Sequence, residues 1–154
     1  MIAFPRTRAV ATVLLATALL LPAYTCEGYR SAQGELVENI PSGADSAAYT
    51  PTKIPHRPLE SFDPTVAGDW LTLLAYLWPI LVLGLRLRPS PGRLDRVMHW
   101  SEFLFAPASA VVVYYVAAIG DVAYGTYLAY AANATLFSAG ILEFVKRRRA
   151  AGAG

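Results

Sequence analysis

Four uncharged, apolar stretches are separated by charged or polar segments along the 154-residue chain. They cover residues 9–25, 70–85, 103–120 and 122–142, which are 17, 16, 18 and 21 residues long. A helix rises about 1.5 Å per residue, so each stretch reaches roughly 25 Å or more, close to the hydrocarbon thickness of a bilayer. The hydrophobic content of 55% and the mean hydropathy of +0.39 agree with this assignment. The pattern predicts an all-α membrane protein with four transmembrane helices.

The longest polar segment, residues 26–69, separates the first predicted helix from the other three. It carries seven of the 11 acidic residues and five prolines: Pro41, Pro51, Pro55, Pro58 and Pro64. Each proline removes a backbone donor and restricts the preceding residue, so a long helix is excluded. We expect an extended loop here, with one short strand at residues 34–40 at most.

The basic residues predict the orientation and the domain order. Lys and Arg are retained on the cytoplasmic side during insertion, and a cytoplasmic amino end puts 10 of the 13 bases there. The predicted order is a first transmembrane helix or signal anchor (residues 1–25), an extracytoplasmic loop (26–69), a three-helix bundle (70–145) and a basic cytoplasmic tail (146–154). The bases on the cytoplasmic side, which also contact lipid headgroups, are Arg6, Arg8, Arg86, Arg88, Arg93, Arg96, Lys146, Arg147, Arg148 and Arg149.

The first apolar stretch has a second interpretation. A basic start, an apolar middle and small residues at the end are also typical of a secretory signal peptide, and Cys26 is then a candidate for lipidation. The residues before Cys26 match neither cleavage pattern well, because Tyr24 and Thr25 stand where small residues are preferred. We therefore favour a retained helix. Cleavage would leave three helices with the same orientation.

Two prolines interrupt the second and third predicted helices at the same depth. Pro79 lies seven residues from Arg86, and Pro107 lies seven residues from Trp100, which places both roughly 10 Å into the membrane. Each frees the carbonyl four residues earlier, at Ala75 and Phe103, and kinks its helix. Ordinary helix packing accommodates such prolines. The alternative is a gap for a small molecule, with Tyr114 and Tyr130 lining a site for a flat ligand such as a quinone.

Small residues recur every four positions on the last predicted helix. One row contains Gly125, Ala129 and Asn133, and another contains Ala134 and Ser138. Small side chains let helices approach closely in lipid, so these residues are expected to pack against other helices. A buried Asn133 would need a hydrogen-bond partner, and an interhelical bond is the expected one.

The residues that would carry chemistry are sparse. No carboxylate or histidine lies deep in a predicted span, which argues against a pump or an ion-coupled transporter. The two histidines fall on opposite sides of the membrane and there is one cysteine, so neither a metal nor another cofactor is expected. The lysine–arginine run directly follows an apolar stretch, so topology explains it and a nucleic-acid partner is not expected.

The function predicted from these features is a non-catalytic accessory or scaffold subunit of a larger integral membrane complex, with other membrane subunits and lipids as partners. The alternative is a protein that binds or transports a small molecule or lipophilic cofactor in the gap near Pro79 and Pro107. The first predicted helix ends in Leu20–Leu21–Pro22 shortly before Cys26, and a polar outer loop and three further helices follow. In this arrangement the chain resembles small four-helix bacterial inner-membrane proteins that are themselves uncharacterised. That resemblance implies a location in the bacterial inner (plasma) membrane and no particular activity.

Overall fold

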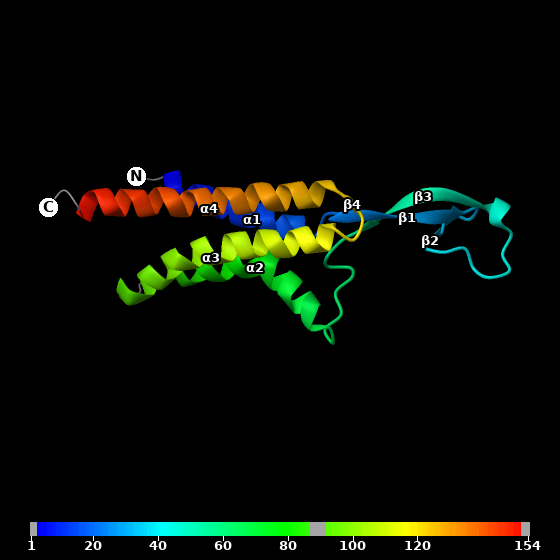
Figure 1. Ribbon diagram of the computed structural model, residues 1–154, viewed down its shortest axis with the longest axis horizontal. Coiled ribbons are helices and arrows are strands. Elements are labelled where there is room, and N and C mark those ends of the chain that lie inside the picture. The colour runs from blue at the N-terminus through cyan, green and yellow to red at the C-terminus, as the bar shows by residue number, and fades with distance from the viewer. Residues whose placement is uncertain (1–2, 87–91, 152–154) are drawn as a thin grey trace.

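The computed structural model describes residues 3–86 and 92–151, which form a helical bundle with a narrow sheet projecting from one end (Figure 1). The start of α1, the end of α2, the start of α3 and the end of α4 all lie at the opposite end of the bundle (Figure 1). The helices are α1 (Ala3–Ala18), α2 (Ala67–Arg86), α3 (Gly92–Ala117) and α4 (Tyr124–Ala151), with the short 3₁₀ helix η1 (Ser46–Ala48). The strands are β1 (Tyr24–Ser31), β2 (Leu36–Val37), β3 (Tyr49–His56) and β4 (Asp121–Val122).

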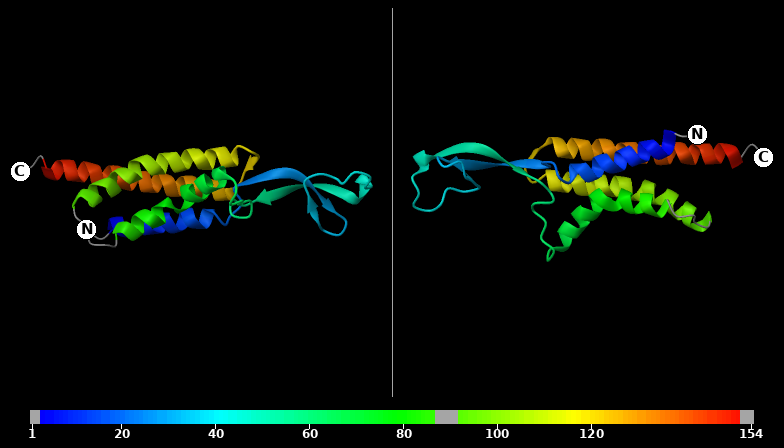
Figure 2. Two further views of the ribbon diagram at one scale, coloured as in Figure 1. Left: turned by 90° about the horizontal axis from the view of Figure 1, so that it is seen from below. Right: turned by 180° about the vertical axis from the view of Figure 1, so that it is seen from behind.

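Three helices are long and apolar enough to cross a membrane. The segments concerned are Ala67–Leu85, Trp100–Ala117 and Tyr124–Lys146, and no more than 33% of the apolar window in each is buried within the protein. Most of their apolar surface therefore faces outwards. The helices pack in the ring order α1–α4–α3–α2, and α1 runs beside α4 in the right-hand view of Figure 2.

The helix α1 is the shortest of the four at 16 residues and lies against the core. Leu15 and Ala18 are fully buried, and Ala11 is almost so. It ends at Ala18, seven residues before the predicted end, because the chain tightens into a turn of i to i−3 hydrogen bonds from Leu19 to Leu21. Pro22 then offers no N–H to continue it. The chain passes directly into β1.

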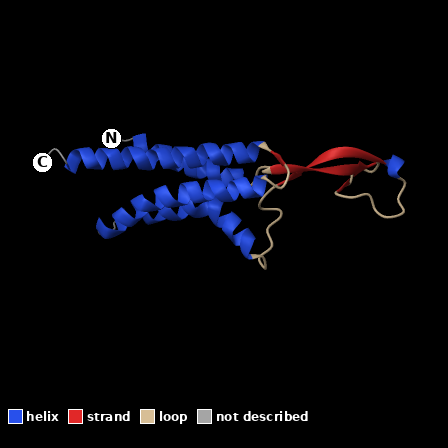
Figure 3. Ribbon diagram, viewed as in Figure 1, coloured by secondary structure: helices blue, strands red, loops and turns tan. Residues whose placement is uncertain are grey.

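The prediction of an all-α protein with an extended loop is wrong for residues 24–56. Strands β1 and β3 pair antiparallel over eight residues each, from Tyr24 opposite His56 to Ser31 opposite Tyr49. The strand β2, inside the predicted short strand, pairs with β1 near the tip, and β4 pairs with β1 at the base (Figure 3). We call residues 24–56 the ribbon.

The prolines did not prevent this sheet because of where they lie. Pro51 and Pro55 are in β3, which is an edge strand in the order β2–β1–β3. Proline is tolerated on an edge strand at positions where the N–H would point away from the neighbouring strand. The same prolines block further strand addition at that edge.

Helices α3 and α4 extend beyond the predicted spans on the side away from the sheet. The helix α3 begins at Gly92 rather than near Met98, and α4 continues through the basic run to Ala151. The helix α2 is bent, and its first turns lean away from the bundle (Figure 1). Pro79 lies inside this helix and accounts for the bend, because it lacks the donor for the Ala75 carbonyl.

Candidate functional site

The base of the ribbon is bonded to the first turn of α4. The Ala23 carbonyl accepts hydrogen bonds from the Ala123 amide at 2.9 Å and from the buried Thr126 hydroxyl at 2.7 Å. The Gly125 amide donates to the Pro22 carbonyl at 3.0 Å. A Cβ at Gly125 would lie 2.6 Å from that same carbonyl oxygen, so the contact requires glycine. The small residue expected to pack on another helix therefore packs on the turn that leads into the ribbon.

The α3–α4 connection makes a second attachment to the ribbon. Its strand β4 pairs with Tyr24 and Thr25, and a Cβ at Gly120 would come within 2.5 Å of the Thr25 carbonyl oxygen. The Lys53 ammonium in β3 forms an exposed ion pair with Asp121, and this hydrogen bond and charge raise the pKa of Lys53. The ribbon is thus fixed at its base through both β1 and β3.

The far part of the ribbon, residues 31–52, is exposed and acidic. Glu35, Glu38 and Asp45 are its charged residues, and all three side chains are exposed. Lys, Arg and His do not occur in this segment. Cys26, the lipidation candidate, lies nearer the base, is half-buried in β1 and stands opposite Ile54.

A buried ionic cluster joins α1 to α3 and α4 near the other end of the bundle. One nitrogen of the Arg8 guanidinium, Nη2, lies 2.7 Å from Glu102 Oε2 and 2.5 Å from Glu143 Oε2. The side chain of Arg8 is 9% exposed and that of Glu102 is 3% exposed. The sequence pattern assigned Arg8 only to topology. The sequence does contain a signal for this cluster, because Arg8, Glu102 and Glu143 lie close to the same end of three predicted helices.

The proline region contains a hydrogen bond between helices. The Ser109 hydroxyl of α3 donates to the Ala75 carbonyl, which Pro79 leaves without its helical donor, at 2.5 Å. Pro79 is buried, whereas Pro107 is exposed. An apolar groove of about 230 Å³ lies between α2 and α3, and neither Pro79 nor Pro107 is among the residues that line it. This α2–α3 groove is lined by Leu71, Leu74, Ala75, Trp78, Phe105, Ala108, Ser109 and Val112.

The other residues singled out in the spans are spread over several surfaces. Tyr114 is exposed and Tyr130 half-buried, and neither lines the α2–α3 groove. On α4, Ala129 and Asn133 are buried, while Ala134 and Ser138 are exposed. The Asn133 amide donates to the Ala129 carbonyl of its own helix at 3.0 Å, so this bond is not interhelical.

The basic residues gather at the end of the bundle opposite the ribbon. Lys146, Arg148 and Arg149 are exposed on α4, and the Arg148 guanidinium lies 4.7 Å from the centre of the Phe144 ring. Arg86 is in α2, Arg93 and Arg96 are in α3, and Arg147 is in α4, but their side chains fall outside the described part, and Arg88 falls outside it altogether.

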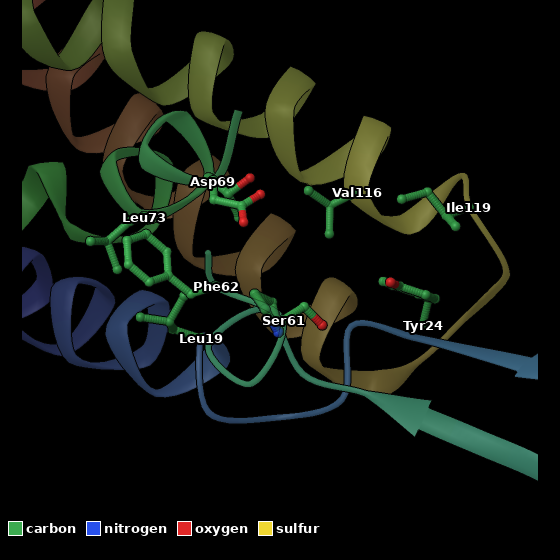
Figure 4. A pocket seen from close by; sticks show the side chains of 10 residues that line it. Leu19, Tyr24, Ser61, Phe62, Asp69, Leu73, Val116 and Ile119 are labelled. Carbon is green, nitrogen blue, oxygen red and sulfur yellow. The ribbon is translucent and has the colours of Figure 1, made fainter. Parts of the chain in front are cut away.

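A pocket of about 110 Å³ lies where the ribbon meets the bundle (Figure 4). It is bordered by the turn after α1, the start of β1, the 57–66 loop, the first turns of α2 and the end of α3 with the turn that follows it. We call it the sheet-end pocket, and its lining residues are Leu19, Tyr24, Pro58, Ser61, Phe62, Asp69, Thr72, Leu73, Val116 and Ile119. Sequence patterns gave no sign of it, since these residues come together only through the ribbon.

Within residues 3–86 and 92–151, no three His, Cys, Asp or Glu residues are grouped so that they could hold a metal ion. No protein-family model, curated protein or solved structure matches the chain. Its function has to be inferred from its own residues.

Proposed function

We propose that the protein is a non-catalytic accessory or scaffold subunit of a larger integral membrane complex, and that the ribbon is the part that contacts the partner. The observation that carries this proposal is the ribbon itself. It projects beyond the helices as an arm with no helix covering its faces among the described elements (Figures 1 and 2).

The way the ribbon is anchored supports a contact role. A narrow hairpin alone in water is marginally stable, and a hairpin that served only as a connection would not need a fixed direction. This one is bonded to α4 through Pro22 and Ala23 and paired with β4. A rigid arm loses little conformational entropy when it binds, which favours association.

The apolar helices of the bundle support the proposal that this subunit is embedded in a membrane. Three helices are apolar enough to cross a membrane, and most of each apolar window is not buried within the protein. The proposal takes α1, which packs against α4, as the fourth span. In the proposed orientation both chain ends face the cytoplasm, since 10 of 13 bases then lie on that side. The ribbon then extends from the extracytoplasmic surface of a bacterial inner membrane, within reach of neighbouring subunits.

Co-purification tests the proposal. The full chain, tagged at its carboxyl end, is extracted from native membranes in mild detergent beside a variant in which a two-residue Asn–Gly turn replaces residues 27–53. In this variant β1 and β3 still pair at the base of the ribbon, with Tyr24 opposite His56 and Cys26 opposite Ile54. We expect companions to purify with the full chain and to be lost with the shortened ribbon, while both chains stay folded. A homogeneous particle near monomer mass from the full chain would contradict the proposal.

A second candidate, binding of a lipophilic small molecule, is favoured by the α2–α3 groove, whose walls include Ala75 and Ser109 but neither Pro79 nor Pro107. It is open to the apolar surroundings and its walls are almost wholly apolar. Replacing Ala108, an exposed wall residue, by Trp would fill the groove. Loss of a co-extracted lipophilic compound from this variant would support binding in the groove, and an unchanged compound would contradict it.

A further inference from the structure

We infer that the sheet-end pocket binds a primary ammonium group carried on a short hydrocarbon chain. Its sources are an aminoethyl lipid headgroup at the membrane surface or a free small amine. The inference is independent of the scaffold role, because it concerns the junction of ribbon and bundle and not the arm.

The charge of the pocket selects a cation. Asp69 is the only acidic residue among the ten that line it, and no lining residue is basic. Two basic residues precede the lining residue Pro58 in the sequence: Arg57 is exposed and donates to Glu60 at 2.5 Å, and the His56 ring stacks on Tyr24. An anionic ligand would face the Asp69 carboxylate without a compensating charge.

The hydrogen-bonding groups select a donor-rich ligand. Asp69 Oδ2 accepts from the Asp63 amide at 2.7 Å, and within the described part of the chain its second oxygen has no donor. The Ser61 hydroxyl donates to the Arg57 carbonyl and the Thr72 hydroxyl to the Gly68 carbonyl, so both oxygens can still accept. A primary ammonium offers three N–H donors and no acceptor, which matches such a set.

Tyr24 adds to the polar side of the site. Its ring stacks on His56 at 5.0 Å between centres, and its hydroxyl end points into the pocket (Figure 4). Burial, with smaller contributions from Cys26 and Glu38, raises the pKa of Tyr24 and keeps the phenol neutral. A neutral phenol can accept a hydrogen bond from an ammonium without changing the charge of the pocket.

The walls and the volume of the pocket limit the chemical group that can be attached to the ammonium nitrogen. Leu19, Leu73 and Val116 line the pocket together with the ring of Phe62, so the group attached to the nitrogen is hydrocarbon. A volume of about 110 Å³ is several times the roughly 10–15 Å³ that one water molecule requires. That is room for an aminoethyl group.

The position of the pocket explains how a lipid would reach it. The apolar segment of α2 begins at Ala67 and that of α3 ends at Ala117, so the pocket lies at the border of the apolar surface. Ile119 on its rim is 67% exposed. The border of the hydrocarbon region is where lipid headgroups lie.

The test uses the purified full chain in nanodiscs of phosphatidylglycerol containing either phosphatidylethanolamine or phosphatidylcholine. Bound lipids are counted by native mass spectrometry after release, and free ethanolamine is tested by thermal shift. We expect retention of phosphatidylethanolamine over phosphatidylcholine. Stabilisation by ethanolamine alone would identify the free amine as a sufficient ligand, and lipid retention without it would identify the headgroup. Equal retention of both lipids with no effect of ethanolamine would overturn the inference.

Three variants separate the site from general effects. Asp69→Asn keeps an oxygen for the Asp63 amide and removes the charge, and it should weaken ammonium binding about tenfold or more. Asp45→Asn makes the same charge change on an exposed side chain at the tip of the ribbon, keeps an oxygen for the Ala47 amide, and should leave binding unchanged. Ile119→Trp, at an exposed rim position, should block the entrance even if Asp69→Asn fails to fold. Equal effects of Asp69→Asn and Asp45→Asn, or normal binding by both pocket variants, would overturn the inference.

Discussion

Arg8 holds α1 against α3 and α4 through two carboxylates that are remote in sequence. A buried ion pair adds little net stability compared with an apolar replacement, because desolvation offsets the attraction. Removing one partner is different, since the charges left behind remain buried. Arg8 therefore matters less as a source of stability than as the residue without which Glu102 and Glu143 are poorly tolerated.

Replacing Arg8 by Ala should destabilise the fold by about 3–5 kcal/mol, the usual cost of breaking a buried pair. The matched control is Arg6→Ala, which removes an exposed arginine two residues away and should change the free energy of unfolding by no more than about 0.5 kcal/mol. Unfolding in mixed detergent micelles, followed by circular dichroism, measures both. Similar small effects of the two substitutions would show that the cluster does not hold α1.

Gly125 offers a second residue-scale prediction. Gly125→Ala brings a Cβ to 2.6 Å from the Pro22 carbonyl oxygen, and relieving this contact should cost about 1–3 kcal/mol. Gly84→Ala is the control, because a Cβ there meets nothing within 4 Å, and the helix should gain up to about 1 kcal/mol. Thermal shifts of opposite sign are expected, and stabilisation by both would contradict the close contact at the ribbon base.

At the scale of elements, the apolar stretches located the three long helices, whereas of the sheet only a short strand at residues 34–40, which contains β2, was expected. Runs of uncharged residues locate α2, α3 and α4 because lipid-facing helices need them. The ribbon was missed because five prolines in residues 26–69 are typical of loops. Whether a proline breaks a strand depends on which side its missing N–H faces, and that is known only once β1 and β3 are paired. The sheet-end pocket depends on the same pairing.

The hydrogen bond between Ser109 and Ala75 is an element-scale consequence of Pro79. Ser109→Ala should destabilise the bundle by about 0.5–2 kcal/mol, because it leaves the freed carbonyl without a donor. In a Pro79→Ala background, residue 79 has its own N–H for that carbonyl, so the same serine substitution should cost less. A double-mutant cycle measured by unfolding gives the coupling. Equal costs in the two backgrounds would show that Pro79 is not the reason for the bond.

For the whole molecule, the described structure separates the acidic ribbon from the basic end. Ribbon and basic residues lie at opposite ends of the bundle, as the charge pattern requires if each faces a different side of a membrane (Figure 1). The placement of that membrane still comes from the charge pattern.

Cysteine labelling in intact cells tests the orientation. In a Cys26→Ser background, a single cysteine at Glu35 on the ribbon should react with a membrane-impermeant maleimide, because it faces outwards. A single cysteine at Arg149 should react only after the cells are opened. The reverse pattern would invert the proposed topology.

Extraction of native membranes in mild detergent, followed by native gel electrophoresis, tests the central claim most directly. An accessory subunit predicts that the full chain migrates with companion proteins, and that replacing residues 27–53 by a short turn releases the folded bundle from them. A full chain that migrates alone near monomer mass, or companions that remain bound without the ribbon, would contradict the role proposed for this arm.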